Sequence, residues 1–127
     1  MATPRTALNR LRKIALALPD AVEQETWGKP HFRVKGKIFC GYGEENGVTC
    51  IGCKLDKKHA FRIVNQDGYW LSPFGGKHGW ISIDVAVIND WKHLESLIHE
   101  SYSLIAPKRS LAKLNSPAPT PKTTRKK

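Results

Sequence analysis

The feature of this sequence that most constrains its fold is an alternation of apolar and polar residues in three separate segments. After Trp80, the apolar residues Ile81, Ile83 and Val85 recur at every second position. Residues 31–35 and 50–55 alternate in the same way. Because successive side chains of a strand point to opposite faces of its sheet, each segment predicts a strand with one apolar face. The pattern favours an antiparallel sheet that is covered on one face only.

Amphipathic helices on both sides of these segments can supply that cover. Residues 6–18 keep apolar side chains at a spacing of three and four, and Pro19 ends the pattern. Residues 91–105 show the strongest helical stripe of the chain, after a cap at Asn89 or Asp90. Two long helices therefore flank the strands in the sequence.

Turn and cap signals divide the chain between these helices. Lys-Gly and Asn-Gly pairs between alternating runs indicate hairpins, and an aspartate before a helical pattern indicates a cap. In chain order the signals predict a connection (20–29), three strands (31–34, 37–42 and 48–55), a short helix (56–65) and two strands (69–72 and 80–85). With a last short helix at 109–114, we predict a two-layer α+β fold of order α-β-β-β-α-β-β-α, with the helices packed on one face of an antiparallel sheet.

The net charge of +10 is concentrated near the C-terminus. From Pro107 onward there are seven basic residues and no acidic one, whereas residues 1–106 carry 14 basic and 11 acidic side chains, a net charge of only +3. We expect one domain over residues 1–114 and a disordered basic tail, rich in Pro, Thr and Lys, over residues 115–127. A folded body at +3 attracts polyanions weakly by its total charge alone.

The chain lacks the patterns of membrane and secreted proteins. No apolar run approaches the roughly eighteen residues of a membrane span, and basic residues are spread through the first helical pattern instead of preceding an apolar block. We expect a cytoplasmic monomer without a membrane partner.

Cys50 and Cys53 have C-x-x-C spacing, which can indicate a redox pair or half of a zinc site. They lie on a predicted strand, however, where residues three apart point to opposite faces, and no second cysteine pair follows. Structural thiols are the favoured interpretation, and a metal or redox role is the alternative. The five histidines show no H-x-x-x-H or H-E-x-x-H spacing. The sequence therefore predicts no metal, no cofactor and no catalytic motif.

The turn Gly75-Gly76-Lys77-His78-Gly79-Trp80 concentrates a cation, an imidazole and an indole before a strand. It resembles a phosphate-binding P-loop only superficially, because Leu71 occupies the position of the first glycine and His78 that of the Ser or Thr. If the alternation extends back by one residue, His78 shares the uncovered face of the sheet with Trp80. Arg33 and Lys54 are predicted on the same face. Cations beside an aromatic platform suit phosphates, stacked bases or an anionic ligand, and the alternative is an ordinary solvated face.

Three motifs resemble the MmcQ/YjbR family. They are Trp27-Gly28-x-Pro30-x-Phe32-Arg33-Val34-x-Gly36-Lys37-x-Phe39, the turn Gly76-Lys77-His78-Gly79-Trp80 before a strand with Asp84, and a closing helix from Trp91 through Ser101-Tyr102 to Ala106-Pro107-Lys108-Arg109. The resemblance implies a CyaY-like or secretion-chaperone-like architecture and a DNA-binding protein of the double-wing type. The tail from Asn115 onward lies outside the resemblance.

We therefore expect a DNA-binding module that contacts backbone phosphates with low sequence specificity. The first hairpin turn is basic, whereas the second carries Glu44 and Glu45, which phosphates would repel. The residues expected to contact DNA or a ligand are Arg33, Lys35, Lys37, Lys54, Lys77, His78 and Trp80. The alternative is a module that binds a small anion or a protein on the open sheet face around Arg33, His78 and Trp80.

Overall fold

The computed structural model describes residues 4–26, 28–73 and 75–115. Apart from Asn115, which ends the last helix, the predicted tail lies outside the described residues. The elements in chain order are α1 (Pro4–Leu16), β1 (Ala21–Thr26), β2 (Lys29–Val34), β3 (Lys37–Glu45), β4 (Val48–Lys54), α2 (Lys57–Ile63), β5 (Tyr69–Leu71), the 3-10 turn η1 (Gly76–His78), β6 (Trp80–Asp84), the 3-10 turn η2 (Val85–Val87), α3 (Trp91–Ile105) and α4 (Lys108–Asn115).

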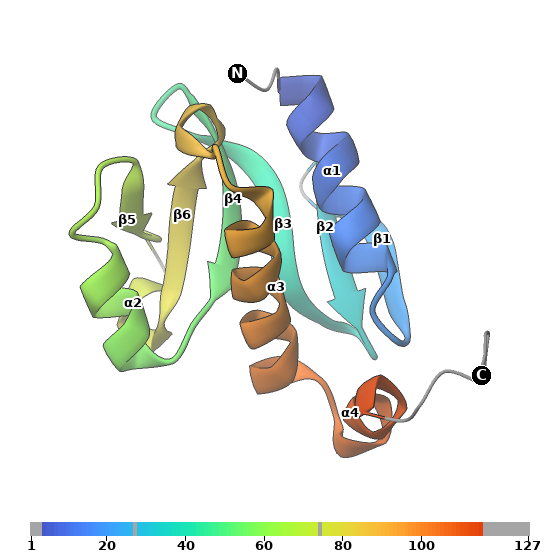
Figure 1. Ribbon diagram of the computed structural model, residues 1–127. Coiled ribbons are helices and arrows are strands. Elements are labelled where there is room, and N and C mark those ends of the chain that lie inside the picture. The colour runs from blue at the N-terminus through green and yellow to red at the C-terminus, as the bar shows by residue number, and fades with distance from the viewer. Residues whose placement is uncertain (1–3, 27, 74, 116–127) are drawn as a thin grey trace.

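The predicted α+β architecture is confirmed. Six strands form one antiparallel sheet in the order β1-β2-β3-β4-β6-β5. Figure 1 shows α1 and α3 across one face of this sheet, α2 beside β5, and α4 beyond the C-terminal end of α3. The face away from α1 and α3 is called the open face below.

The prediction of a connection over residues 20–29 was wrong, because Ala21–Thr26 form the edge strand β1. Four of its six residues are exposed, among them Glu23 and Glu25. Charged side chains protect an edge strand from pairing with other chains. Because both faces of β1 carry polar residues, its sequence lacks the apolar alternation by which a strand is predicted.

Two hairpin turns set the register of the sheet. Lys35 and Gly36 have φ values of 50° and 86°, and Asn46 and Gly47 have 52° and 79°. Positive φ at both central residues is typical of type I′ turns, whose twist matches that of the strands they join. The resulting register aligns His31, Gly41, Gly52, Ser82 and Trp70 in one row across five strands.

The covered face holds the core. Apolar residues of four strands are fully buried under α1 and α3, and the Phe39 and Tyr102 rings meet edge to face at 5.4 Å. Complete burial of a large apolar side chain contributes about 1.5–3 kcal/mol. The buried strand residues are Phe32, Val34, Phe39, Cys40, Ile51, Cys53, Ile81 and Ile83. Cys50 and Cys53 lie on opposite faces, as the strand interpretation predicts, because their cross-strand partners alternate.

A β-bulge interrupts the sheet at Phe39, where the β2–β3 register shifts. The regular pairing of β3 with β4 begins only at Cys40 opposite Cys53. The buried Ser101 hydroxyl of α3 bridges the two strands there, because it donates to the Phe39 carbonyl and accepts from the Lys54 amide at 2.8 Å. The last residue of β4 is therefore fixed directly by α3.

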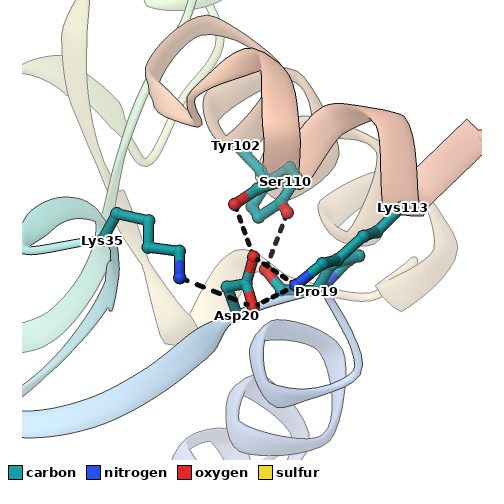
Figure 2. Close-up of polar contacts among 6 residues, drawn as sticks. All are labelled: Pro19, Asp20, Lys35, Tyr102, Ser110 and Lys113. Carbon is teal, nitrogen blue, oxygen red and sulfur yellow. Dashed lines mark hydrogen bonds and ion pairs between the residues drawn. The ribbon is translucent and has the colours of Figure 1, made fainter.

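The last helix is tied to the start of the sheet through Asp20 (Figure 2). Asp20 has a left-handed φ of 63°, and its carboxylate accepts from the Ser110 hydroxyl at 2.6 Å and from the Lys113 ammonium at 2.9 Å. Nearby, the Tyr102 hydroxyl donates to the Pro19 carbonyl at 2.7 Å. These bonds join the α1–β1 connection to α3 and α4.

Candidate functional site

Basic side chains gather at one end of the sheet. The Lys35-Gly36 turn joins β2 to β3, β4 ends at Lys54, and Lys54 lies opposite Trp80, the first residue of β6. The register therefore places the first hairpin turn, the start of α2 and η1 at the same end, the lower end in Figure 1. We call this surface the basic end; its residues are Lys35, Lys37, Lys54, Lys57, Lys58, Lys77 and His78. All are exposed except Lys54, which is half-buried.

The acidic residues near the basic end are bonded within the fold. Asp56 caps α2 by accepting from the Lys58 amide at 3.1 Å. Glu100 of α3 accepts from the Asp56 amide at 2.9 Å and lies 2.8 Å from His59 Nδ1. Lys57 and Lys58 are thereby held on a capped turn, while their own side chains stay exposed.

Acidic and basic side chains are mixed at the opposite end of the sheet. Glu44 lies beside the second hairpin turn, Asp84 ends β6, and Asp90 caps α3 by accepting from the amides of Lys92 and His93. Lys29 begins β2 and Lys92 lies in the first turn of α3 at this same end. The basic end is therefore the more uniformly charged of the two, and a folded body with a small net charge can present such a local field.

A hollow of about 620 Å³ opens at the basic end. It is lined by Lys54, Leu55, Asp56, Lys57, Lys58, His78 and Leu104. Four of these side chains are cationic or can become so, and only Asp56 is acidic. A phosphate group in this hollow would meet donors from β4, α2 and η1.

Two basic side chains at the first hairpin turn already contact other groups of the protein. Arg33 donates to the Gly36 carbonyl at 2.8 Å and to Thr26 Oγ1 at 3.2 Å, so its guanidinium braces the turn from inside. Within the described part of the chain, no group bonds the buried Arg33 Nε. Lys35 lies 4.0 Å from the Asp20 carboxylate (Figure 2), whereas Lys37 is exposed.

The Asp20 carboxylate forms ion pairs with Lys35 of the first hairpin turn and with Lys113 of α4. Hydrogen bonds from Ser110 and Lys113, with the nearby charges of Lys113 and Lys35, hold the pKa of this carboxyl below its ordinary value. Asp20 therefore remains ionised and neutralises part of the positive charge of Lys35 and Lys113.

The predicted grouping of His78 with Trp80 on the open face was wrong. The strand does not extend back to His78, because Gly76–His78 form the 3-10 turn η1 and Gly79 has a left-handed φ of 100°. His78 is exposed and lines the hollow of the basic end, together with Lys54. Trp80 lines a different hollow, and Arg33 lines neither.

That second hollow, of about 430 Å³, lies on the open face. Three glycines of β3 and β4, Gly41, Gly43 and Gly52, border it. His31 borders it from β2, where its ring covers Gly41, and Trp80 borders it from β6, packed against Gly75. We call this the open-face hollow.

A carboxylate lies in the wall of the open-face hollow. Glu45 Oε1 accepts from the Trp70 indole at 2.8 Å, and Oε2 accepts from the Ser82 hydroxyl at 2.6 Å and from the Cys50 thiol at 3.7 Å. Ser82 is in turn 3.2 Å from the Ser72 hydroxyl. These bonds draw Glu45 from the second hairpin turn across the sheet towards β5 and β6.

The cysteines lie in surroundings that suppress their reactivity. Burial, reinforced by the negative charge of Glu45, raises the pKa of Cys50 to about 12, and burial raises that of Cys53 to about 12. Burial also raises the pKa of Cys40 well above its ordinary value. The thiols are free and protonated at neutral pH, so they are poor nucleophiles and poor metal ligands.

Within the described residues, no three or more His, Cys, Asp or Glu side chains cluster in a way that could hold a metal ion. Among the same residues, no helix combines the length and apolar character needed to cross a membrane.

The sequence alone did not single out several residues of these two surfaces. Lys57 and Lys58 lie at the basic end because β4 runs towards it and α2 follows β4. Their position directly after the predicted cap at Asp56 could have indicated exposed lysines in the first turn of a helix. Glu45 lies beside a predicted turn, where the sequence indicates only repulsion of phosphate. Gly43 and Gly52 have no side chain that predicts a contact, although glycine inside a strand often marks a close approach by a ligand or another backbone.

Comparisons with known proteins agree with this fold. The YjbR family model matches residues 16–104. No curated protein matches the chain. A Deinococcus radiodurans protein with a DUF419 domain has a similar structure, with a TM-score of 0.72 and 17% identity over 92% of this chain and 94% of the other.

Two further solved structures share the fold. A Pseudomonas syringae protein has a TM-score of 0.63 and 17% identity over 81% of this chain and 98% of its own. A DUF1801-family protein of Bacillus subtilis has a TM-score of 0.54 and 17% identity over 100% of this chain and 90% of its own. At these identities the likeness concerns the fold alone.

Proposed function

The chain belongs to the YjbR family, and from this premise we propose that it is a DNA-binding module that contacts backbone phosphates through its basic end. The observation that carries the proposal is the collection of lysines from four separate segments at one end of the sheet, all of them exposed except the half-buried Lys54. Lysine ammonium groups bind phosphates as point charges, and contacts to phosphates carry no direct sequence information. The expected binding is therefore of low sequence specificity.

The distribution of the acids supports the same surface. Asp20, Asp56 and Glu100 near the basic end are hydrogen-bonded to protein groups. Glu44, Asp84 and Asp90 lie at the far end, together with Lys29 and Lys92. DNA would therefore meet a larger excess of lysines over carboxylates at the basic end than at the far end.

Among the nominated contacts, Lys37, Lys54 and Lys77 have the strongest support, and Lys57 and Lys58 join them. Arg33 has less support because its guanidinium already bonds Gly36 and Thr26. Lys35 has less support because Asp20 partly neutralises it.

The test is fluorescence anisotropy with a duplex DNA over a salt series. Binding through several phosphates predicts that log affinity falls linearly with log salt, with a slope of about −0.9 for each contact. The double variant Lys57→Ala/Lys58→Ala is expected to make that slope shallower by about two units.

The matched control is Lys13→Ala/Lys92→Ala, which removes the same charge from exposed positions on α1 and α3. This control should leave the slope almost unchanged. Equal losses in both double variants would mean that only the total charge matters, and would reject the basic end as the binding surface.

A chain ending at Leu114 separates the folded domain from the residues beyond it. It should keep most of the salt slope of the full chain. If this shortening abolishes all binding, the domain is not the DNA-binding part, and the basic residues beyond Leu114 are.

A small anion on the open face has less support as an alternative. Arg33, His78 and Trp80 do not border one hollow, and Glu45 places a negative charge in the wall of the hollow that Trp80 borders.

A further inference from the structure

Two of the glycines that border the open-face hollow, Gly43 and Gly52, are not required by the fold itself. Gly43 and Gly52 lack the left-handed φ that favours glycine. A Cβ atom would lie 4.0 Å from Lys29 Cγ at Gly43 and 3.6 Å from the Ile81 carbonyl at Gly52, which are ordinary van der Waals distances. Glycine inside a strand is less favourable than alanine because it loses more conformational freedom on folding. These two positions therefore keep space open above the sheet at a cost in stability.

The register of the strands indicates the width of this space. His31 and Ser82 stand at its two sides in the same row, with Gly41 and Gly52 between them. This row spans three interstrand distances, about 14 Å, and the His31 ring covers the part above Gly41. A flat molecule can lie in the remaining part, above Gly43 and Gly52 and against the indole of Trp80.

The polarity of the wall restricts what can lie there. Glu45 Oε1 accepts one bond, from Trp70, and a carboxylate oxygen can accept two. A ligand that offers an N–H group can use the remaining position, whereas an anion would be repelled. A volume of about 430 Å³ is within the range of small-molecule sites.

We propose that the open-face hollow is a binding site for a planar nitrogen heterocycle with an N–H donor, of the nucleobase type, which stacks on Trp80 and donates to Glu45. Indole faces bind bases of any sequence by stacking, and a hydrogen bond to a charged acceptor adds selectivity for the donor. This site is separate from the basic end and does not depend on the function proposed above.

The test is an NMR titration of the full-length, ¹⁵N-labelled chain with uncharged nucleosides. Adenosine is expected to shift the amide signals of Gly41, Gly43 and Gly52 and the indole signal of Trp80, with a dissociation constant on the order of 0.1–1 mM. Purine riboside has the same ring without the amino group, and should bind roughly tenfold more weakly. Equal affinities for the two nucleosides, or no shift at these signals up to about 10 mM adenosine, would overturn the proposal.

Two variants test the two features of the site separately. Gly43→Ala/Gly52→Ala fills the floor and should lower adenosine affinity at least about tenfold, while its melting temperature stays the same or rises. Glu45→Gln keeps the size of the side chain and removes its charge, so adenosine should lose most of its advantage over purine riboside. Unchanged adenosine affinity in the glycine variant would contradict the proposal whatever happens in the other.

The heterocycle could be free or part of a nucleic acid strand, and a further arm distinguishes these sources. A short single strand of deoxyadenosine should shift the same glycine signals if bases in a strand enter the hollow. Lys57→Ala/Lys58→Ala should then weaken binding of the strand and leave binding of free adenosine unchanged. If only the free nucleoside shifts these signals, the source is a small molecule. A failure of duplex binding would leave both results unaffected.

Discussion

The basic end and the open-face hollow are built in opposite ways. The basic end is assembled from long, exposed side chains on turns and helix starts, which four segments contribute. The open-face hollow is made inside the strands, mostly by the absence of side chains at Gly43 and Gly52. The first surface depends on charge, and its binding should respond to salt. The second depends on shape and one carboxylate, and its binding of neutral molecules should not.

The two surfaces meet at the start of β6. Gly76–His78 belong to the basic end, and Trp80, two residues later, borders the open-face hollow. One turn serves both surfaces here because the left-handed Gly79 ends η1, so that His78 and Trp80 border different hollows.

The thiol of Cys50 offers the largest expected effect. It lines the open-face hollow, yet its pKa of about 12 leaves almost no thiolate at pH 8. Reaction of the native protein with a disulfide reagent should be about a thousandfold slower than in urea, for all three cysteines. Rapid reaction of Cys50 in the native protein would show that the hollow is more polar and more open than described.

Replacement of Gly79 should disturb both surfaces at once. A Cβ at this position would collide with the Leu55 carbonyl, and its φ of 100° is strained for any other residue. Gly79→Ala should lower the free energy of unfolding by roughly 3 kcal/mol or more, as measured in urea.

Gly47→Ala is the matched control for Gly79→Ala. Gly47 also has a left-handed φ, of 79°, but a Cβ there meets no atom within 4 Å. It should cost only about 1–2 kcal/mol. Equal losses in the two variants would mean that the contact with Leu55 relaxes freely.

Duplex binding should separate the two surfaces. At 0.1 M salt, Lys57→Ala/Lys58→Ala is expected to weaken duplex binding about 10- to 100-fold through the two lost phosphate contacts. Gly43→Ala/Gly52→Ala should change duplex affinity less than about twofold, because it alters no charge. If the glycine variant weakens duplex binding as strongly, the two regions are one site.

The smallest effect is expected from Asp20, which belongs to the fold and to the electrostatics of the basic end. Its pKa lies below the ordinary carboxyl value of 3.8, so its contribution to stability is complete above that pH and is lost as the pH falls through the lower folded-state pKa. Asp20→Asn tolerates the left-handed φ but lacks this titration. Urea unfolding between pH 2 and 6 should therefore show a shallower acid loss in the variant.

The same substitution removes the negative charge that Lys35 and Lys113 share. Duplex affinity at pH 7 should therefore rise slightly. A fall in affinity without a loss of folded protein would place Asp20 in a role that its contacts do not explain.

Much of the fold could be predicted because local signals agreed with it. The alternation over residues 80–84, the Asn46-Gly47 turn and the cap at Asp90 all coincide with the structure. The edge strand β1 could not be predicted in this way, because its exposed charges resemble those of a loop.

The candidate surfaces were harder to predict, because they depend on which strands are neighbours. Lys57 and Lys58 meet the first hairpin turn only through the direction of β4. Glu45 reaches Trp70 and Ser82 because β6 lies between β4 and β5 in the sheet, an order that does not follow the chain. His78 was predicted on the open face because its position fits the alternation of the strand that follows. It lies instead in the 3-10 turn η1, which precedes that strand.

The bonds between Asp20 and α4 also have a consequence for synthesis. Asp20 and Lys113 are 93 residues apart, so a ribosome working at about 5–20 residues per second needs roughly 5 to 20 s to make the second after the first. During that interval Lys35 is the ion-pair partner that emerges first for this carboxylate. Lys35 is therefore available to Asp20 before α4 exists, and the bonds from Ser110 and Lys113 can be added only after the last helix has been made.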